Sequence, residues 1–187
     1  MMIKVYIDEH IDDFNLEEAL CQISPQRREQ ALRFKFEHGQ RTCVLAYLLL
    51  KKALREQYGI TENPVFEYGE HGKPSIVGHP EIFFNLSHCR EAVACVVGDS
   101  PVGIDVESVG RYRDSVARYA MNEEELSLIR SSERPDITFT RLWTMKEAVL
   151  KQSGVGLRDS MKNVLTGNER LETVEVLEKG YVYSVVS

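Results

Sequence analysis

Alternation of apolar and polar residues predicts several short strands along the chain. A period of two is typical of strands that bury one face, because successive side chains point to opposite sides. Strands of this kind are predicted at residues 3–7, 82–87, 92–97, 102–107, 173–177 and 181–186. A turn-rich segment is expected to hold two shorter strands, near residues 65–68 and 75–77.

Helical periodicity and capping residues predict the remaining elements. Residues 40–58 form a long apolar pattern that ends at Gly59, and residues 136–152 form a second one that ends near Gly154. Glycine is common after helices because it adopts the left-handed conformation without a steric penalty. Shorter helices are expected at residues 15–21, 24–36, 111–119 and 122–130.

The order of these elements predicts an α+β protein. In each half a long helix follows shorter ones and leads to a glycine, and Leu50-Lys51 is echoed by Leu150-Lys151. This hints at duplication, although the identity between the halves is too low to prove it. The pattern therefore fits either one domain or two small, closely packed halves.

The charge distribution argues against nucleic-acid binding and is compatible with an anionic small-molecule ligand. The 187-residue chain has a formal net charge of -6, which disfavours general contact with nucleic acid. Residues 21–60 nevertheless hold eight Lys or Arg against three acids. This basic segment is either a binding surface for an anion or a solvated helix face, and the charges alone do not decide between them.

Compartment and redox state follow from the apolar runs and the cysteines. The longest strongly apolar run, residues 43–50, is far shorter than the roughly 20 residues that cross a bilayer. The N-terminus is acidic rather than basic and apolar. The four cysteines lack C-x-x-C spacing, and Cys43 and Cys95 lie in apolar runs. We expect a cytoplasmic protein without membrane contact, with buried thiols rather than disulfides or a zinc site.

Three carboxylates and one lysine stand out against apolar neighbours. Asp105 and Glu107 share one face of a predicted strand, and Gly103 on the same face would let a ligand approach the backbone. Glu147 and Lys151 are four residues apart on one helix face. Oxygen ligands beside a cation suit Mg²⁺ bound with a phosphate-bearing substrate. The alternatives are a solvated strand face and an exposed ion pair between Glu147 and Lys151.

The amino-acid sequences of these segments resemble motifs of a known family. The strand reads GIDVE at residues 103–107, and the helix reads WTMKEAVLK at residues 143–151. Further matches upstream occur in the family's order at residues 23–29, 41–42, 72–74 and 84–88. Together these motifs resemble the 4′-phosphopantetheinyl transferases, in particular the larger, monomeric kind with two similar halves. The resemblance extends from about residue 23 to 157. It implies a pseudo-dimeric α+β fold of two similar αβ halves, residues 1–98 and 99–187, with antiparallel sheets, one long helix each and a substrate cleft between them.

The resemblance implies a reaction and a set of site residues. These enzymes move 4′-phosphopantetheine from coenzyme A (CoA) to a serine of an acyl or peptidyl carrier protein and release adenosine 3′,5′-bisphosphate. By resemblance, Asp105, Glu107 and Glu147 would hold Mg²⁺, and Glu147 and Lys151 would be catalytic. The implied CoA contacts are Arg27, Arg41, Lys73, Pro74, Asn85, Ser87, His88, Asp105 and Lys151. Gln30 departs from the family because relatives often have a second lysine there.

The segment after GIDVE is the expected docking surface for the carrier. It offers apolar side chains beside arginines that could steer an acidic partner: Tyr112, Val116, Tyr119 and Met121, with Arg111, Arg113 and Arg118. An ordinary amphipathic helix would have the same pattern. Two rival functions stay open, a Mg²⁺-dependent phosphohydrolase and a non-catalytic carrier-binding relative. A hydrolase triad is not indicated, because the neighbouring side chains of Ser87 and His88 diverge on a strand.

Overall fold

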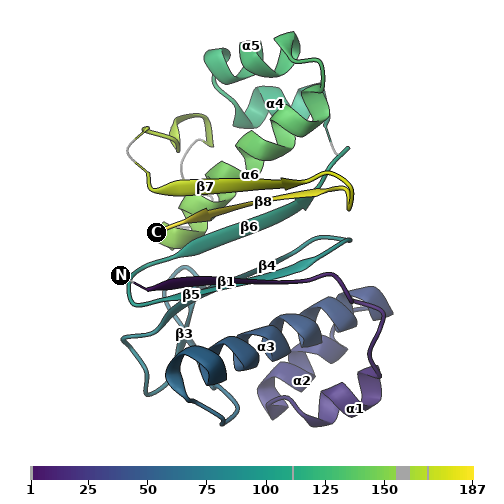
Figure 1. Cartoon of the computed structure of the whole chain (residues 1–187), viewed down its shortest axis with the longest axis vertical. Coiled ribbons are helices and arrows are strands. Elements are labelled where there is room, and N and C mark those ends of the chain that lie inside the picture. The colour runs from purple at the N-terminus through teal and green to yellow at the C-terminus, as the bar shows by residue number, and fades with distance from the viewer. Residues whose placement is uncertain (1, 111, 155–160, 168) are drawn as a thin grey trace.

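Two three-stranded antiparallel sheets lie at the centre of the molecule, and helices cover their outer sides (Figure 1). The computed structural model describes residues 2–110, 112–154, 161–167 and 169–187. One group of helices packs below the first sheet in this view, and a second group packs above the other sheet. The chain therefore forms four layers, in the order helix, sheet, sheet, helix.

The first sheet and its helices come from the N-terminal half of the chain. Its elements are β1 (Ile3–Asp8), α1 (Leu16–Cys21), α2 (Pro25–Leu32), α3 (Glu37–Tyr58), β2 (Phe66–Tyr68), β3 (Pro74–Ile76), β4 (Phe83–His88) and β5 (Val93–Gly98). The strand order is β1-β5-β4, and β2 and β3 form a separate hairpin. Ser24 caps α2 through the backbone N–H of Arg27, and Gly59 ends α3 at φ 70°.

The second sheet belongs to the C-terminal half. Its elements are β6 (Gly103–Ser108), α4 (Asp114–Ala120), α5 (Glu123–Ser131), α6 (Pro135–Ser153), the 3₁₀ turn η1 (Met161–Asn163), β7 (Leu171–Val176) and β8 (Tyr181–Val186). The strand order is β6-β8-β7. Asn122 and Glu125 form a capping box at the start of α5, and Gly154 ends α6 at φ 69°.

Both sheets have the same strand order. In the first sheet β1 and β4 pair with the central strand β5, and in the second sheet β6 and β7 pair with the central strand β8. In both halves the central strand is thus the last strand of that half in the sequence. Each half also contains one long helix, α3 with 22 residues and α6 with 19. The predicted α+β class, antiparallel sheets and long helices are thus confirmed. The last strand of the first sheet ends at Gly98, and the first strand of the second sheet begins at Gly103. The boundary between the two halves after residue 98 stays a prediction.

The sheets meet through an apolar core and through their edge strands. Alternate residues of β5 and β6, among them Val96 and Ile104, pack between the sheets with side chains of β1 and β8. At the edges, the Asn85 side chain accepts a hydrogen bond from the Ile104 N–H (2.9 Å), and the Ser87 hydroxyl accepts one from the Val106 N–H (3.2 Å). Side chains of β4 thus satisfy backbone donors of β6 that a neighbouring strand would otherwise take.

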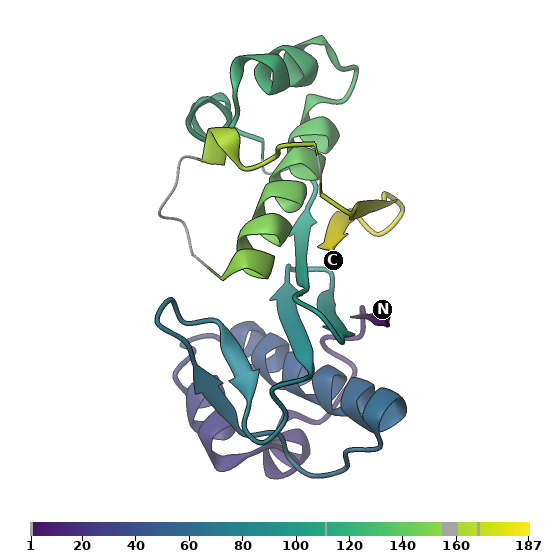
Figure 2. The same cartoon turned by 90° about the vertical axis from the view of Figure 1, so that its left-hand side faces the viewer.

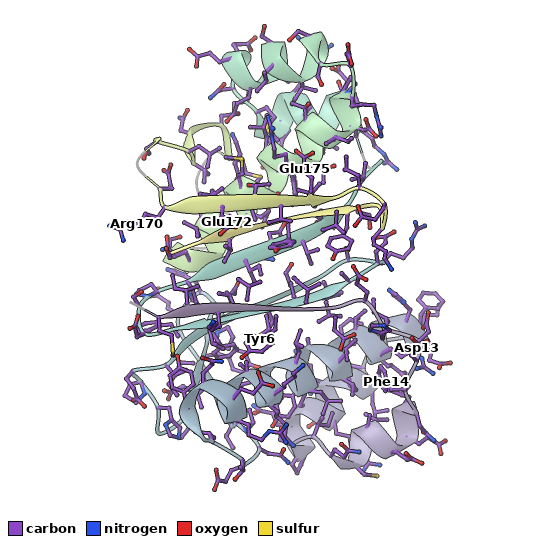
Figure 3. The ribbon with its side chains drawn as sticks, in the orientation of Figure 1. Tyr6, Asp13, Phe14, Arg170, Glu172 and Glu175 are labelled. Atoms are coloured by element: carbon purple, nitrogen blue, oxygen red, sulfur yellow. The ribbon has the colours of Figure 1, made fainter. Side chains whose placement is uncertain are left out.

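The outer face of the first sheet packs on α3. Figure 3 shows Tyr6 on the side of β1 that faces this helix, and its hydroxyl donates to Glu56 (3.0 Å) and accepts from Gln57 (2.8 Å). Cys43 and Cys95, with Cys89, are buried free thiols, as the sequence predicts, whereas Cys21 is free and exposed. Within the described residues, no helix is long and apolar enough to span a bilayer.

Some predicted boundaries were wrong. The helix expected at residues 24–36 ends at Leu32, and α3 begins at Glu37 rather than at residue 40. The side chain of Gln40 donates to the Phe34 carbonyl (3.0 Å), which stabilises the sharp connection between the two helices. The helix expected at residues 111–119 begins at Asp114 instead, and Arg111 lies outside the described residues.

Candidate active site

Ser87, Asp105 and Lys151 meet where the two halves join. They come from β4, β6 and α6 respectively. The Lys151 ammonium donates to Asp105 Oδ1 (2.6 Å) and to Ser87 Oγ (2.9 Å), and the Ser87 hydroxyl donates to the same Asp105 oxygen (2.9 Å). The Asp105 residue is only 3% exposed, so the alternative of a solvated strand face is wrong. Residues from both halves therefore build one charged cluster.

The second carboxylate oxygen of Asp105 lacks a hydrogen-bond partner. Among the described residues, Asp105 Oδ2 is one of three buried side-chain polar atoms in this state. A buried carboxylate oxygen without a donor is costly, because burial removes the hydrogen bonds that water would supply. This oxygen is therefore available to a ligand that carries positive charge.

Glu147 adds a second acid to the cluster. Burial raises the pKa of Glu147, the negative charge of Asp105 raises it further, and Lys151 opposes the rise. Lys151 forms its ion pair with Asp105, so the expected alternative of a simple surface pair between Glu147 and Lys151 does not describe this site. Two acids and one lysine leave the cluster with excess negative charge when both carboxyls are ionised.

Gly103 serves a different purpose from the one predicted. A Cβ atom there would lie 2.0 Å from the Ala148 carbonyl oxygen and 2.6 Å from the Gln152 nitrogen. The missing side chain lets the backbone of α6 approach β6, and not a ligand as expected. This close packing fixes the distance between the strand that carries Asp105 and the helix that carries Glu147 and Lys151.

Glu107 lies two residues further along β6, on the same face as Asp105. It lines a cavity of about 570 Å³ together with residues of α6 and of the segment before α4, including Trp143, Phe139, Tyr112 and Arg113. In the described part of the chain, no group of three His, Cys, Asp or Glu side chains is close enough to hold a metal ion. Glu107 thus faces a larger, partly aromatic cavity beside the charged cluster.

Two further cavities extend from the cluster toward the N-terminal half. The first, of about 210 Å³, has Lys73, Pro74 and Asn85 on one side and Glu147 and Lys151 on the other. The second, of about 260 Å³, shares Pro74 and Asn85 with the first. Its other lining residues are Arg27, Gln30, Phe34, Cys43, Ala46, Phe66, Tyr68, Phe84, Leu86 and His88. Residues of both halves line the first of these cavities, whereas the second lies within the N-terminal half.

Basic groups gather at the second of these cavities. Arg27 donates two hydrogen bonds to the Cys43 carbonyl (2.9 and 3.2 Å) and one to Gln30 (3.0 Å), which fixes its guanidinium. The surrounding protein lowers the pKa of His88 by desolvation, and the charges of Lys151, His38 and Arg27 lower it further. His88 is exposed while Ser87 is buried, so these neighbours do diverge as predicted.

Lys73 and Arg41 make contacts within the protein that the sequence did not indicate. The Lys73 ammonium donates to the carbonyls of Gln152 (2.6 Å) and Val102 (3.4 Å) in the other half. Arg41 pairs with Glu37 (2.8 Å) and lies over the ring of Phe14, which Figure 3 shows on the helical side of the first sheet. Among the described residues that line the three cavities, Arg41 is not found.

Comparison with known proteins bears directly on this cluster. The model of the 4′-phosphopantetheinyl transferase superfamily matches residues 101–184, which contain Asp105, Glu107, Glu147 and Lys151. The chain is 30% identical over 156 residues to 4′-phosphopantetheinyl transferase Sfp of Bacillus subtilis, an alignment that covers 82% of this chain and 70% of the relative. The chain belongs to the 4′-phosphopantetheinyl transferase superfamily. The transferase activity that the motifs implied is accordingly supported.

Two further relatives carry the same family name. The present chain is 33% identical over 154 residues to 4′-phosphopantetheinyl transferase psf-1 of Bacillus pumilus, an alignment that covers 79% of this chain and 66% of the relative. It is 30% identical over 151 residues to 4′-phosphopantetheinyl transferase HetI of a Nostoc strain, an alignment that covers 76% of this chain and 64% of the relative. The chain thus spans roughly two thirds of the length of the curated relatives that it matches.

The transferase also contains a buried lysine to which sequence reasoning gave no role. Lys146 is fully buried and donates to Glu125 (2.6 Å), to the Met161 carbonyl (2.7 Å) and to the Ala120 carbonyl (3.0 Å). It thereby ties α6 to α4, α5 and η1. Its spacing offered a signal, because Lys146 lies four residues from both Leu142 and Leu150 on the buried stripe of the helix.

The expected docking surface of the transferase needs one correction. Tyr112 and Val116 line the cavity of about 570 Å³, and Tyr119 is 76% exposed. Met121, however, is fully buried, because the chain turns inward after α4 and places this side chain in the core of the C-terminal helices. Arg118 is exposed and pairs with Asp114 (2.6 Å). The accessible surface is therefore smaller than predicted.

Proposed function

We propose that this chain moves 4′-phosphopantetheine from CoA to a serine hydroxyl of an acyl or peptidyl carrier protein and releases adenosine 3′,5′-bisphosphate. The observation that carries the proposal is the cluster at the junction of the halves. There Asp105 has one oxygen paired with Lys151 and one buried oxygen that has no hydrogen-bond partner among the described residues, beside the acid Glu147. A pyrophosphate with a divalent cation matches this pattern of charges.

The donor set fits Mg²⁺, although it is not preassembled. Carboxylate oxygens are the ligands that Mg²⁺ prefers, and Asp105 Oδ2 lacks another partner. Glu147 feels the charge of Asp105, so a cation between them would relieve their repulsion. We propose Asp105, Glu147 and Glu107 as the residues that would hold the ion. When bound, Mg²⁺ would offset pyrophosphate charge and polarise the bond that breaks.

Glu147 is our candidate for the general base. The serine oxygen of the carrier would attack the phosphorus on the pantetheine side of the pyrophosphate, forming one P–O bond as the other P–O bond breaks. The serine proton would pass to Glu147, directly or through a water, and adenosine 3′,5′-bisphosphate would leave with the bridging oxygen. A pKa raised toward the working pH makes a carboxylate a better base. Lys151 would stabilise negative charge on the leaving phosphate.

The N-terminal half would bind the nucleotide end of CoA. Arg27 is already oriented by the Cys43 carbonyl, so little side-chain freedom would be lost on phosphate binding. His88 has a lowered pKa in the free protein, and a nearby phosphate dianion would favour its protonated form. Ser87, Asn85 and Pro74 connect this region to the charged cluster. Arg41 would have to leave Glu37 before it could contact CoA.

The proposed site is complete within one chain. Pro74 and Asn85 from one half and Glu147 and Lys151 from the other line the same cavity. This arrangement supports our proposal of a monomeric enzyme, since no residue from a second copy is required. The carrier would approach over Tyr112 and Val116, beside the exposed Arg113 and Arg118, because carrier proteins are typically acidic.

Intact-protein mass spectrometry tests the proposal. The protein would be incubated with CoA, Mg²⁺ and a panel of apo carriers from fatty-acid, polyketide and peptide synthesis. We expect at least one carrier to gain the mass of one phosphopantetheine group, with one equivalent of adenosine 3′,5′-bisphosphate. Cleavage of CoA without carrier modification would favour a phosphohydrolase. Carrier binding without either product would favour a non-catalytic relative.

A further inference from the structure

The β2–β3 hairpin reaches across the boundary between the halves through a single lysine. Figure 2 shows this hairpin extending from the N-terminal half toward the C-terminal end of α6. Lys73, directly before β3, donates to the Gln152 carbonyl in the last turn of α6 and to the Val102 carbonyl before β6. One ammonium group thus joins the hairpin, the helix end and the connection between the sheets.

The end of α6 is well suited to a cation from outside the helix. The last four carbonyls of a helix have no partner within it, and the negative end of the helix dipole favours positive charge there. Gly154 already supplies its N–H to the Leu150 carbonyl. The Gln152 carbonyl obtains its partner from Lys73, 79 residues earlier in the chain. The contact therefore contributes to the C-terminal cap of the helix.

The aliphatic part of Lys73 has its own packing site. A Cβ atom on Gly154 would lie 3.0 Å from Lys73 Cδ and 3.5 Å from its Cβ. The stem therefore packs beside the glycine that ends α6, and the glycine leaves room for it. Burial lowers the pKa of Lys73, which agrees with an ammonium group enclosed by protein.

We propose that Lys73 is a positioning residue that latches the β2–β3 hairpin to the end of α6 and so sets the width of the cleft in which Glu147 and Lys151 lie. The hairpin supplies one wall of the cavity of about 210 Å³, and α6 supplies the opposite wall. This inference rests on the proposed function only in identifying that cavity as part of the CoA site. The contact of Lys73 with CoA that the resemblance implied stays a prediction, and the binding measurements below distinguish it from the latch.

Amide hydrogen exchange of the protein without CoA tests the latch independently of any activity. Lys73→Met keeps the stem and removes the ammonium group, Lys73→Arg keeps a cationic donor, and Lys52→Met on the exposed side of α3 is the matched control. In Lys73→Met we expect amides at the end of α6 and in the hairpin turn to exchange about ten- to a hundredfold faster, as for one lost hydrogen bond to a charged group. Lys73→Arg and Lys52→Met should retain the wild-type rates.

Unchanged exchange in Lys73→Met, or equal acceleration in Lys73→Arg, would overturn the latch. Binding measurements then distinguish it from a contact with the 3′-phosphate of CoA. For a latch, Lys73→Met should weaken the affinities for CoA and for 3′-dephospho-CoA by the same factor. A loss of affinity that appears with CoA and disappears with 3′-dephospho-CoA would instead assign Lys73 to the phosphate. If neither compound binds the wild-type protein, the proposed function fails while the exchange result still decides the latch.

Discussion

Replacing Lys146 by methionine should strongly destabilise the C-terminal half. Methionine fills a similar volume but removes the ammonium group that pairs with Glu125. Glu125, with a side chain only 11% exposed, would then be a buried carboxylate without its cation. The carbonyls of Ala120 and Met161 would also lose their donor.

The magnitude follows from this burial. Removing one partner of a buried ion pair costs about 3–5 kcal/mol, because the remaining charge is left without compensation. For a chain of this size, 1 kcal/mol corresponds to about 2–4 °C in the melting temperature, so a decrease of about 6–20 °C is expected. The double variant Lys146→Met, Glu125→Gln removes both charges and keeps an oxygen for the capping box with Asn122. It should recover a large part of the loss.

Thermal unfolding followed by circular dichroism measures both effects. The exposed-lysine variant Lys52→Met serves as the control and should melt within about 1–2 °C of wild type, as is usual for surface substitutions. A Lys146→Met protein that melts together with this control would refute the reasoning. A double variant that is no more stable than the single one would show that the lost carbonyl contacts, and not the unpaired Glu125, dominate.

Three further predictions concern the site. Gly103→Ala should prevent stable folding, because the added Cβ would overlap the α6 backbone. The control Gly69→Ala, whose Cβ would have its nearest neighbour at 3.7 Å, should fold normally. The yield of soluble protein and the melting temperature of both variants check this. The wild-type protein should take up more protons on binding CoA near pH 7 than His88→Gln does, because contact with a phosphate would raise the lowered pKa of His88. Calorimetry in buffers of different ionisation enthalpy measures the number of protons taken up, and equal uptake by both proteins would contradict the prediction. The pKa of Glu147 is raised in the folded protein, so ionisation of this residue lowers the free energy of unfolding as the pH rises above the ordinary pKa of a glutamate. In the presence of chelator, Glu147→Gln should therefore melt at a higher temperature than wild type at neutral pH but not at about pH 4. A difference in melting temperature that does not change with pH would argue against the raised pKa.

The strands were predictable because their signal is local. Alternation along residues 102–107 gave the correct face for both Asp105 and Glu107. It could not give the burial of Asp105, because that burial depends on β4 and on α6, which approach only in the folded chain. The same limit applies to Gly103, whose close neighbours, Ala148 and Gln152, lie more than forty residues later in the sequence.

Lysine residues were the hardest to interpret from sequence. Lys73 lies in the segment at residues 72–74, and Lys146 and Lys151 both lie in the segment at residues 143–151. In the structure Lys73 reaches backbone carbonyls of the other half, Lys146 is fully buried and pairs with an acid, and Lys151 pairs with Asp105. A long flexible side chain can reach several partners, so local spacing restricts its position without selecting the partner. Only the long-range packing of α6 separates these three roles.

The central claim is that Asp105 is essential to phosphopantetheine transfer, and single-turnover transfer in Asp105→Asn tests it most directly. Asparagine keeps the shape but removes the charge that Lys151 and a divalent cation would share. With saturating CoA, Mg²⁺ and an accepted apo carrier, we expect the first-turnover rate to fall by more than about a hundredfold, as for other lost electrostatic contacts to a reacting group. Transfer by Asp105→Asn at the wild-type rate would contradict the account.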